Sequence, residues 1–490
     1  MMTSAATIVP AIQSELVESL FSSHLFRDGE LPNLAIAKNP ADGFDPTRLA
    51  DGTEALWISN PAQLGIPVGA RLSPLWQNGL GLIVFRNAPL QIVGGIFVNG
   101  AIRNPWNEIG KDAFQCLGGI MLFSDDPKEI KSAEQLLADA IRKSNAMKDK
   151  FQFIDLNLED ERIPARTLLG GGKSSAAHPA GEKGRRDAVR VTASVAAPIG
   201  IYISGSDQNM TGALCTYFAE CAPKNFMGAA NHPIPTYGGM ADPSPWTALG
   251  VYHAFKTVRR KIFNQVRIPV FFQGAGNVGI PLVNHIRKDG HPISGIIDTR
   301  LEALEGIRAM GIDAPLFLQL PDGAPEPDRK RLQDANIRVV RGLVEALQQA
   351  PETVVFSPNA GPHPITMEVA EYLASSKVRA IVGAANNVLD TVDGSIEPVA
   401  NFLQEHGIYS GNDSETNQMG ALSVTVQRIG MNRELLERAA QGVGARTLQA
   451  IEAFSRGIPP QLARDRAAAK RYNQMLLDGR AVGGYFQNGG

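Results

Sequence analysis

The sequence predicts an α/β protein built of two domains, and three observations support this fold class. The chain has 490 residues, a length that suggests two or three domains. Through its second half, apolar runs of strand length alternate with amphipathic helical segments, which favours a parallel sheet with helices on its faces. A glycine-rich turn joins one of these apolar runs to the helical segment that follows it.

That glycine turn has the setting of a dinucleotide-binding site. The apolar run Ile268–Phe272 predicts a buried parallel strand, and it leads into Gly274-Ala275-Gly276-Asn277-Val278-Gly279. This G-x-G-x-x-G turn is followed by a helical pattern over residues 280–287 and a second apolar run over residues 293–297. Asp298 ends that run, 19 residues after the last glycine. Strand, glycine turn, helix, strand and acid in this order predict a Rossmann domain.

Each part of this fingerprint has a physical reason. Glycines allow positive φ and let backbone amides approach a pyrophosphate at the positive end of the helix. The Asp298 carboxylate would accept hydrogen bonds from a ribose 2′-hydroxyl and repel a 2′-phosphate. The sequence therefore favours NAD, with NADP not excluded because Arg300 lies nearby. The alternative is a glycine loop that binds no ligand.

The composition argues against several other classes of protein. The net charge of −2 disfavours a nucleic-acid or anionic-membrane partner. The three cysteines, Cys116, Cys215 and Cys221, form no C-x-x-C pair and no disulfide framework. No apolar stretch is long enough to span a membrane, and the first residues lack the pattern of a signal peptide. We expect a cytoplasmic protein without a metal site.

The first part of the chain predicts an extension followed by a sheet and a helix. Residues 1–75 are poorly patterned apart from an amphipathic pattern over Gln13–Leu25, and we prefer oligomer contact or surface wrapping for the loops there. Gly81–Phe85 and Leu90–Val98 predict adjacent strands. Pro127–Met147 predicts a strong helix, with charges opposite its apolar stripe.

Three glycines before one lysine, Gly170-Gly171-Gly172-Lys173, are not explained by propensity. Glycines weaken any regular element, but they let a small ligand lie against bare backbone with an ammonium beside it. The alternative is a flexible surface loop that ends in a solvated lysine. Val189–Val195 and Pro198–Ser204 predict strands, and the second leads to Asp207. An acid at the end of an apolar strand is a common catalytic position in α/β folds, although such an aspartate alone is more often a helix N-cap.

A stiff turn, Asp242-Pro243-Ser244-Pro245-Trp246-Thr247, predicts the start of the Rossmann domain and precedes a helix at 248–258. The later elements that we expect are strands at 337–340, 353–357, 379–383 and 407–409 and helices at 343–349, 435–454 and 462–477. The strand at 379–383 ends in Ala384-Ala385-Asn386-Asn387. The asparagine pair suits hydrogen bonding to a nicotinamide or a substrate edge, although alone it would only form a turn.

Several stretches together resemble one family, the superfamily of glutamate, leucine, phenylalanine and valine dehydrogenases, and fit its leucine/phenylalanine/valine branch best. They occur in the order of that family, and they are Leu117-Gly118-Gly119, Gly170-Gly171-Gly172-Lys173, Tyr202-Ile203-Ser204 with Asp207, Asp242-Pro243-Ser244-Pro245-Trp246-Thr247-Ala248, Gly250-Val251-Tyr252, Gln273-Gly274-Ala275-Gly276-Asn277-Val278, Ala384-Ala385-Asn386-Asn387, Asp413 with Asn417, and Gly457-Ile458-Pro459 with Asp465 and Arg471. Their shared order and spacing argue against chance agreement.

The resemblance implies a fold, a reaction and the roles of two residues. The implied fold has two domains separated by a deep cleft, with the C-terminal helices returning to the first. The implied reaction is reversible oxidative deamination, in which an L-amino acid, NAD(P)⁺ and water give a 2-oxo acid, ammonia and NAD(P)H. Lys173 matches the catalytic lysine, whose pKa desolvation must lower for it to act as a base. Asp207 matches the proton-shuttling acid.

The remaining site residues are carried over in the same way. Gly118 and Gly119 match the glycines beneath the substrate, and Thr247 matches a residue near the nicotinamide carboxamide. Asn386 or Asn387 matches an asparagine that contacts the substrate and the nicotinamide ribose, and Ala384 in the same stretch is assigned to the cofactor.

Three departures from the family bear on the substrate. The family places a second lysine, which grips the substrate carboxylate, closer to the catalytic one. Lys150 is the candidate here, but it lies 23 residues before Lys173, so either an insertion intervenes or the carboxylate is held otherwise. Met121 stands where the family usually has Arg. His178 is either an extra polar group in the cleft or a loop histidine.

We expect residues 1–115 to form an N-terminal extension and the start of the substrate domain, 116–242 the substrate domain, 247–420 the Rossmann domain, and 421–490 C-terminal helices packed on the substrate domain. The expected function is NAD-dependent oxidative deamination of a non-acidic, apolar or aromatic L-amino acid, or its reverse, in a homo-oligomer without nucleic-acid or membrane partners. One alternative is a reductase of an unusual imine or oxo acid in specialised metabolism. Another is a non-catalytic cofactor-binding protein, against which the presence of both Lys173 and Asp207 argues.

Overall fold

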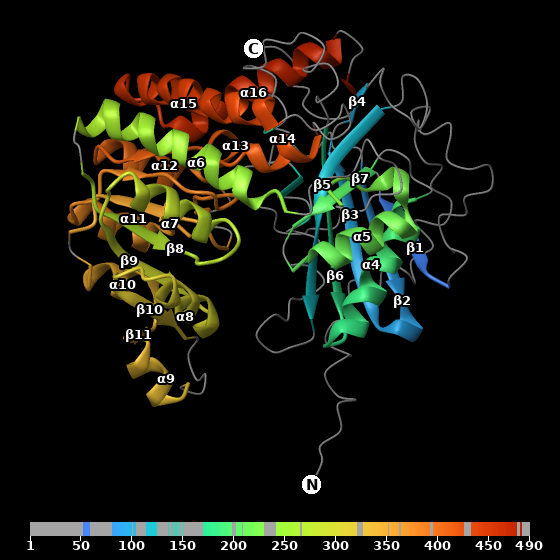
Figure 1. The fold of residues 1–490 in the computed structure, drawn as a ribbon. Coiled ribbons are helices and arrows are strands. Elements are labelled where there is room, and N and C mark those ends of the chain that lie inside the picture. Colours follow the sequence, from blue (N-terminus) through green and yellow to red (C-terminus); the bar gives the residue numbers. More distant parts are fainter. Residues whose placement is uncertain are drawn as a thin grey trace. The chain divides into compact units, whose positions relative to one another are not determined.

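The computed structural model divides the chain into two compact units (Figure 1). The first comprises Met1–Asp242, Ala421–Asn432 and Ala468–Gly490, and the second comprises Pro243–Gly420 and Arg433–Ala467. The structure describes residues 52–58, 81–99, 101–103, 114–124, 136, 140, 143–144, 147, 150, 170–197, 202–207, 209–229, 242–264, 267–320, 327–350, 352–361, 364–392, 395–425, 433–477 and 481–482. The helix expected over Gln13–Leu25 lies outside these ranges.

A mixed eight-stranded sheet forms the centre of the first unit. The strands run in the order β1-β2-β3-β6-β5-β4-β15, with β7 paired to β5. Their bounds are β1 (Glu54–Ile58), β2 (Gly81–Asn87), β3 (Ile92–Asn99), β4 (Ala101–Arg103), β5 (Phe114–Ser124), β6 (Gly170–His178), β7 (Tyr202–Ser206) and β15 (Ala481–Val482). The adjacent strands expected after residue 80 are confirmed as the antiparallel pair β2 and β3, joined through the short helix η6 (Ala88–Leu90).

Two helices, α4 (Glu182–Ala196) and α5 (Gly212–Cys221), pack on each other, and α4 contacts strands β3, β5 and β6; the 3-10 turn η8 (Pro223–Asn225) follows α5. The strand predicted over Val189–Val195 is wrong, because this segment lies within α4. Val189, Thr192 and Ala196 are all fully buried and recur at helical spacing. The β-branched residues between them concealed that period.

The glycine run before Lys173 opens strand β6, which rules out the alternative of a flexible surface loop. All nine residues of β6 are buried. A Cβ at Gly172 would lie 2.6 Å from the Tyr202 ring, so the strand needs glycine there to fit against β7. The helix predicted over Pro127–Met147 is confirmed at its described residues and reaches Lys150.

The second unit contains a seven-stranded sheet in which every ladder is parallel. The order is β11-β10-β9-β8-β12-β13-β14. The bounds are β8 (Val270–Gln273), β9 (Ile293–Asp298), β10 (Leu316–Gln319), β11 (Ile337–Val340), β12 (Val355–Pro358), β13 (Ala380–Ile381) and β14 (Tyr409–Ser410). The first strand, β8, lies between β9 and β12, where the strand order reverses. Ligands of open α/β sheets bind at such a switch point.

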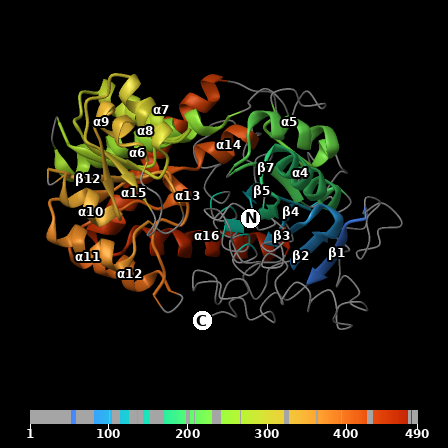
Figure 2. The ribbon, with the colours of Figure 1, turned by 90° about the horizontal axis from the view of Figure 1, so that it is seen from below.

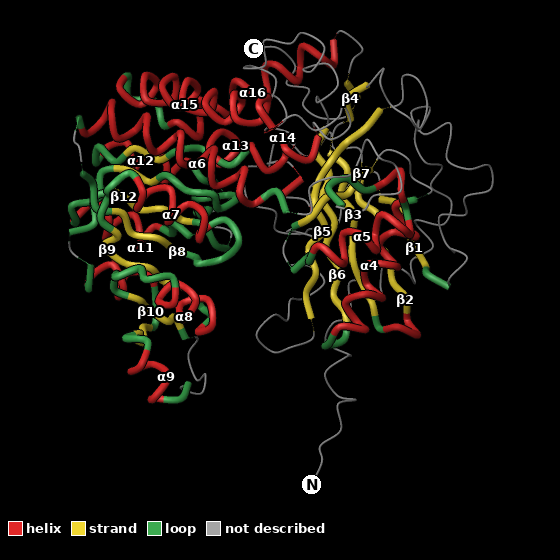
Figure 3. Tube along the Cα trace, in the orientation of Figure 1, coloured by secondary structure: helices red, strands yellow, loops and turns green. Residues whose placement is uncertain are grey.

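Helices surround the strands of this second sheet (Figure 3). They are α6 (Ser244–Val258), continued by a π-helical turn η10 (Arg259–Phe263), α7 (Gly279–Lys288), α8 (Leu301–Ala309), α9 (Arg329–Asp334), α10 (Leu343–Gln348), α11 (Met367–Ser375), α12 (Glu397–Glu405), α13 (Asp413–Thr416) and α15 (Arg433–Ser455). Two further helices, α14 (Met419–Thr425) and α16 (Pro460–Leu477), begin in the second unit and continue in the first. The strand, turn, helix, strand and acid of the fingerprint are confirmed as β8, α7 and β9 with Asp298 at its end.

The long helix α15 runs beside α6 (Figures 1 and 2). It buries Leu436, Ala440, Val443 and Thr447 at helical spacing, and Gly444 faces the Thr257 hydroxyl of α6. Residues Arg433–Ala467 group with the second unit, whereas Ala421–Asn432 and Ala468–Gly490 group with the first. The expected packing of residues 421–490 on the substrate domain stays a prediction.

Candidate active site

Lys173 and Asp207 form an ion pair that joins two strands of the first unit. Lys173 lies within β6, and Asp207 directly follows β7; both strands flank β5. The Lys173 ammonium contacts Oδ2 of the Asp207 carboxylate. The lysine side chain is 5% exposed and the aspartate side chain 19% exposed, so the pair is largely withdrawn from water. A buried ammonium needs such a partner, because an unpaired buried charge is strongly destabilising.

Two glycines of β5 lie directly against the residues that carry or precede this pair. A Cβ at Gly118 would lie 1.4 Å from the carbonyl oxygen of Gly172, and a Cβ at Gly119 would lie 2.6 Å from the Asp207 Cβ. The β5–β6 ladder is paired at Leu117 and again at Ile120, but not at the two glycines between them. The structure therefore brings bare backbone, an amine and a carboxylate to one place in the sheet, as the sequence predicted for Gly118, Gly119, Lys173 and Asp207.

Sequence reasoning missed the hydroxyl group of Tyr202, which bonds to the β5 backbone where the β5–β6 ladder is interrupted. The hydroxyl donates to the carbonyl oxygen of Gly118 at 3.1 Å and lies 3.1 Å from the Ser174 hydroxyl. Tyr202 is fully buried, and burial raises the pKa of its hydroxyl well above the ordinary value. The phenol therefore stays protonated and acts as a donor. A tyrosine in an otherwise apolar strand gave only a weak signal for this role.

Three other residues were singled out by the sequence for the substrate site, and the structure describes each of them. Lys150 is helical and 4% exposed, and Lys143, seven residues earlier on the same helix, is 7% exposed. The Lys143 ammonium lies 2.8 Å from Sδ of Met121, the residue that stands in place of the family's arginine. His178 ends strand β6, is buried, and lies 2.9 Å from the Pro179 carbonyl oxygen through Nδ1, so it is a strand residue and not a loop histidine. The role of Lys150 at the substrate carboxylate stays a prediction.

The glycine turn of the second unit leaves no room for side chains at two of its three glycines. Gly274 has φ +94°, and a Cβ there would lie 2.6 Å from the Ala360 Cβ. A Cβ at Gly279 would lie 2.1 Å from the Gly274 carbonyl oxygen. The space at Gly276 is open except for the Arg300 guanidinium, 3.4 Å from where its Cβ would be. A backbone cradle of this kind at the start of helix α7 fits a dinucleotide pyrophosphate.

Asp298 holds this turn from the end of β9. Its Oδ2 accepts the Ala275 backbone N–H at 2.7 Å, and its Oδ1 accepts the Arg300 backbone N–H at 2.8 Å. The Arg300 guanidinium also contacts Oδ1, at 3.2 Å. The Asp298 side chain is 4% exposed and that of Arg300 60%. A buried carboxylate is thus paired with an exposed guanidinium beside the glycine turn. The expected contact of Asp298 with the cofactor ribose remains a prediction.

Residues 383–387, which we call the asparagine loop, follow β13 at the same end of this sheet. Asn387 has φ +50°, and its backbone N–H donates to Oδ2 of Asp413 at 2.8 Å. Asn417 donates through Nδ2 to Oδ1 of Asn386 at 3.0 Å. Sequence reasoning missed Asn359, whose Oδ1 accepts the Ala384 N–H at 3.1 Å from the end of β12. Its position after a parallel strand was the available signal.

Thr247 is buried at the start of α6, and its hydroxyl donates to the Pro243 carbonyl oxygen at 3.2 Å. A Cβ at Gly420 would lie 2.5 Å from that hydroxyl. Its expected role near the nicotinamide carboxamide stays a prediction.

Within the ranges that the structure describes, no group of three or more His, Cys, Asp and Glu side chains could hold a metal ion. None of the described helices is both long enough and apolar enough to cross a bilayer.

The chain has sequence relatives whose names agree with the family that its motifs resemble. It is 28% identical over 245 residues to the leucine dehydrogenase of Thermoactinomyces intermedius, covering 49% of this chain and 57% of that protein. It is 27% identical over 260 residues to the leucine dehydrogenase of Bacillus subtilis (strain 168), covering 52% and 60%. These matches support the resemblance to the glutamate, leucine, phenylalanine and valine dehydrogenase superfamily, and to its leucine dehydrogenase branch, that the motifs predicted. No family model matches the sequence.

The chain spans about three fifths of the length of these two relatives. Among solved structures, the hetero-hexameric glutamate dehydrogenase of Thermus thermophilus superposes with a TM-score of 0.55 at 15% identity, covering 88% of this chain and 89% of that chain. At that identity the likeness concerns the fold alone. It confirms the predicted α/β class, with a Rossmann domain and a second α/β domain.

Proposed function

We propose that this chain catalyses the NAD-dependent oxidative deamination of a non-acidic L-amino acid, apolar or aromatic, and the reverse reductive amination. The observation that carries the proposal is the ion pair of Lys173 with Asp207 beside the bare backbone of Gly119. A Rossmann cradle serves many hydride transfers, whereas a buried amine and carboxylate side by side suit proton transfer at a carbon that bears nitrogen. The leucine dehydrogenase relatives support the non-acidic substrate.

In the proposed mechanism the bound nicotinamide supplies the hydride acceptor for the substrate Cα. A proton first passes from the Lys173 ammonium to the Asp207 carboxylate, which leaves the lysine as a free amine and the aspartate as an acid. Lys173 then removes a proton from water as the water oxygen bonds to the iminium carbon, and the π electrons move to nitrogen. Asp207 donates a proton to the nitrogen of the resulting carbinolamine. The C–N bond breaks, ammonia leaves, and the hydroxyl proton returns to Asp207, which gives the 2-oxo acid. General acid–base steps of this kind contribute about 10²–10⁴-fold each.

The cofactor would lie on the glycine turn. The amides of Gly276 and Asn277 and the start of α7 would receive the pyrophosphate, with Val278 and Gly279 forming the first turn of the helix. Asp298 would accept the adenosine ribose hydroxyls, which favours NAD, and the Arg300 cation beside it would let NADP bind more weakly. Thr247, Ala384 and Asn386 are assigned to the nicotinamide half. Lys150 is assigned to the substrate carboxylate, and Asn387 to the substrate.

We further infer a cytoplasmic enzyme that works as a homo-oligomer. The Thermus thermophilus structure is of a hetero-hexamer, which supports an assembly of several chains. Size-exclusion chromatography with light scattering would test this inference, and a monomer would contradict it.

The function is tested by NADH consumption with ammonia and a panel of 2-oxo acids. We expect turnover with branched or aromatic acids and none with 2-oxoglutarate. Turnover that needs no ammonia, or only with a preformed imine, would replace the proposal by an imine or oxo-acid reductase. NADH binding without turnover across the panel would indicate a non-catalytic protein.

A further inference from the structure

The one-turn helix α13 holds the asparagine loop through its side chains. Asp413 accepts the Asn387 backbone N–H at 2.8 Å. Thr416 donates its hydroxyl to the Gly383 carbonyl oxygen at 2.8 Å. The loop is thus bound at both of its ends by a helix of only four residues.

Asn417, which follows this helix, binds the middle of the loop. Its Nδ2 donates to the Ala384 carbonyl oxygen at 2.8 Å and to Oδ1 of Asn386 at 3.0 Å. The second bond fixes which end of the Asn386 amide accepts, and therefore how that amide is oriented.

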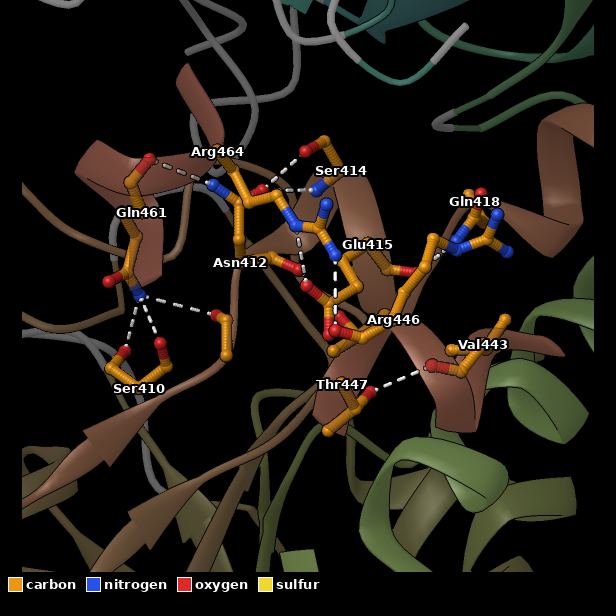
Figure 4. A network of polar contacts seen from close by, with 12 residues as sticks. Ser410, Asn412, Ser414, Glu415, Gln418, Val443, Arg446, Thr447, Gln461 and Arg464 are labelled. Carbon is orange, nitrogen blue, oxygen red and sulfur yellow. Dashed lines mark hydrogen bonds and ion pairs between the residues drawn. The ribbon is translucent and has the colours of Figure 1, made fainter. Parts of the chain in front are cut away.

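Buried charges hold the opposite side of α13 (Figure 4). Glu415, with a side chain that is 1% exposed, accepts from Nε of Arg464 at 3.0 Å, and the Arg464 side chain is 10% exposed. Nη2 of Arg464 also donates to the Arg446 carbonyl oxygen at 3.1 Å. Because Arg464 lies in α16 and Arg446 in α15, the ion pair connects α13 to both of these helices.

Neighbouring polar residues restrain the entry into α13 (Figure 4). Gln461 of α16 donates through Nε2 to the carbonyl oxygen of Ser410 at 2.8 Å and to its hydroxyl at 2.7 Å. Asn412 caps the helix, since its Oδ1 accepts the Ser414 backbone N–H at 2.8 Å. All four of these residues are buried, so water cannot substitute for the bonds.

A four-residue helix has little stability of its own, because one turn does not repay the cost of nucleation. The position of α13 must therefore come from its surroundings. A buried ion pair is a weak source of stability, since removing both charges from water offsets their attraction, but it restricts geometry. The ion pair of Glu415 and Arg464 is thus suited to fixing the position of α13.

We propose that Glu415 and Arg464 are positioning residues for the asparagine loop. They fix α13, and α13 fixes Asn386 and Asn387 for contact with the nicotinamide and the substrate. The inference rests on the proposed function for what the loop contacts. The restraint itself is carried by the bonds described above.

The decisive variant is Glu415→Met/Arg464→Met, which removes both charges and keeps their apolar volume. Replacing a buried ion pair by apolar residues often leaves stability intact. We expect a Tm near that of the wild type and a fall of about tenfold or more in kcat. We also expect faster amide hydrogen exchange in the peptide that contains residues 384–387.

Two further variants sharpen the test. Glu415→Gln keeps the shape of the side chain and a hydrogen bond to Arg464, so we expect a smaller loss of kcat than in the double variant. If the double variant does not fold, Tm, kcat and hydrogen exchange are measured on Glu415→Gln instead. Arg308→Met is the matched control, because Arg308 braces the carbonyl oxygens of Ala335 and Ala314 elsewhere in the second unit. It should lower the Tm without changing kcat or exchange in the loop.

A folded double variant with wild-type kcat and wild-type exchange in the loop would overturn the proposal. Faster exchange with unchanged kcat would do so too, because the restraint would then have no bearing on the reaction. Hydrogen exchange needs no turnover. An inactive wild-type protein would therefore refute the proposed function while the restraint on the loop is still measured.

Discussion

The Tyr202 hydroxyl donates a hydrogen bond to the carbonyl oxygen of Gly118, 3.1 Å away, where the β5–β6 ladder is unpaired beside Lys173. A side chain here replaces a backbone partner. The Gly118 carbonyl group, which is buried at this interruption of the ladder, is therefore not left unsatisfied.

Replacing this tyrosine should affect catalysis more than folding. Tyr202→Phe keeps the ring and removes the donor, so the free energy of unfolding should fall by about 1–3 kcal/mol, the cost of one unsatisfied buried group. We expect kcat to fall because the lost hydroxyl bonds both to Gly118 and to Ser174, the neighbour of Lys173. Tyr217→Phe, at a half-buried tyrosine of the same unit, is the control and should change neither quantity. Equal kcat in Tyr202→Phe and the wild type would contradict the role.

Gly118→Ala should abolish activity and severely destabilise the first unit. The added methyl group would lie 1.4 Å from the Gly172 carbonyl oxygen, a backbone atom that cannot rotate away. Gly306→Ala is the control, since nothing lies within 4 Å of its Cβ position on helix α8. It should be neutral or slightly stabilising by helix propensity. Circular dichroism and thermal melts measure both, and a well-folded, active Gly118→Ala protein would contradict the packing described for β5.

Asp298→Ala should weaken NADH binding more than NADPH binding. The variant removes the proposed acceptor for the ribose hydroxyls and the carboxylate that repels a 2′-phosphate, so about tenfold or more is expected for NADH, as for loss of a charged hydrogen bond. Arg300→Ala should show the opposite preference and weaken NADPH more. Fluorescence titration gives all four dissociation constants. An equal loss for both cofactors in Asp298→Ala would refute the ribose role.

Acid should destabilise the second unit through histidines that are wholly or partly buried. Burial lowers the pKa of His253 from 6.5 to about 4, and Lys256 adds to the effect. Burial also lowers the pKa values of His285 and His291. A folded-state pKa below the unfolded value means that only the unfolded chain takes up the proton between the two values. Stability should therefore be full above pH 6.5 and fall as the pH drops towards 4.

The measurement for this prediction is thermal unfolding as a function of pH. His253→Gln should show a smaller loss of Tm between pH 6.5 and 4 than the wild type. His406, exposed at the end of α12, provides the control substitution His406→Gln. The same pH dependence in all three proteins would rule out His253 as a source of the effect.

The order and type of most elements of the second unit could be predicted because its pattern is local. Apolar runs such as Ile293–Ile297 are buried on both faces of a parallel sheet, and each is followed by a helix of regular period. The first unit was harder to predict. Val189–Val195 has the composition of a strand, and only the sheet beneath it selects the helix. The glycines before Lys173 were not assigned to a strand, because close approach between strands is a tertiary constraint that sequence spacing does not reveal.

The site residues divide in the same way. Lys173, Asp207 and the glycine turn could be predicted because motif and strand order place them at strand ends or against bare backbone. Tyr202 and Arg464 could not, because each acts through contacts with residues far away in sequence. A buried hydroxyl that replaces a ladder bond, and a buried ion pair between helices, are visible only once the chain is folded.

The central claim is that the Lys173–Asp207 pair carries the proton transfers of an amino-acid deamination. The most direct measurement is the single-turnover rate of NADH oxidation with ammonia and the best 2-oxo acid, in the wild type, Lys173→Ala and Asp207→Asn. We predict that both variants fold and bind NADH, yet react at least about 10²-fold more slowly, as expected for loss of a general acid or base. Wild-type rates in either folded variant would contradict the account.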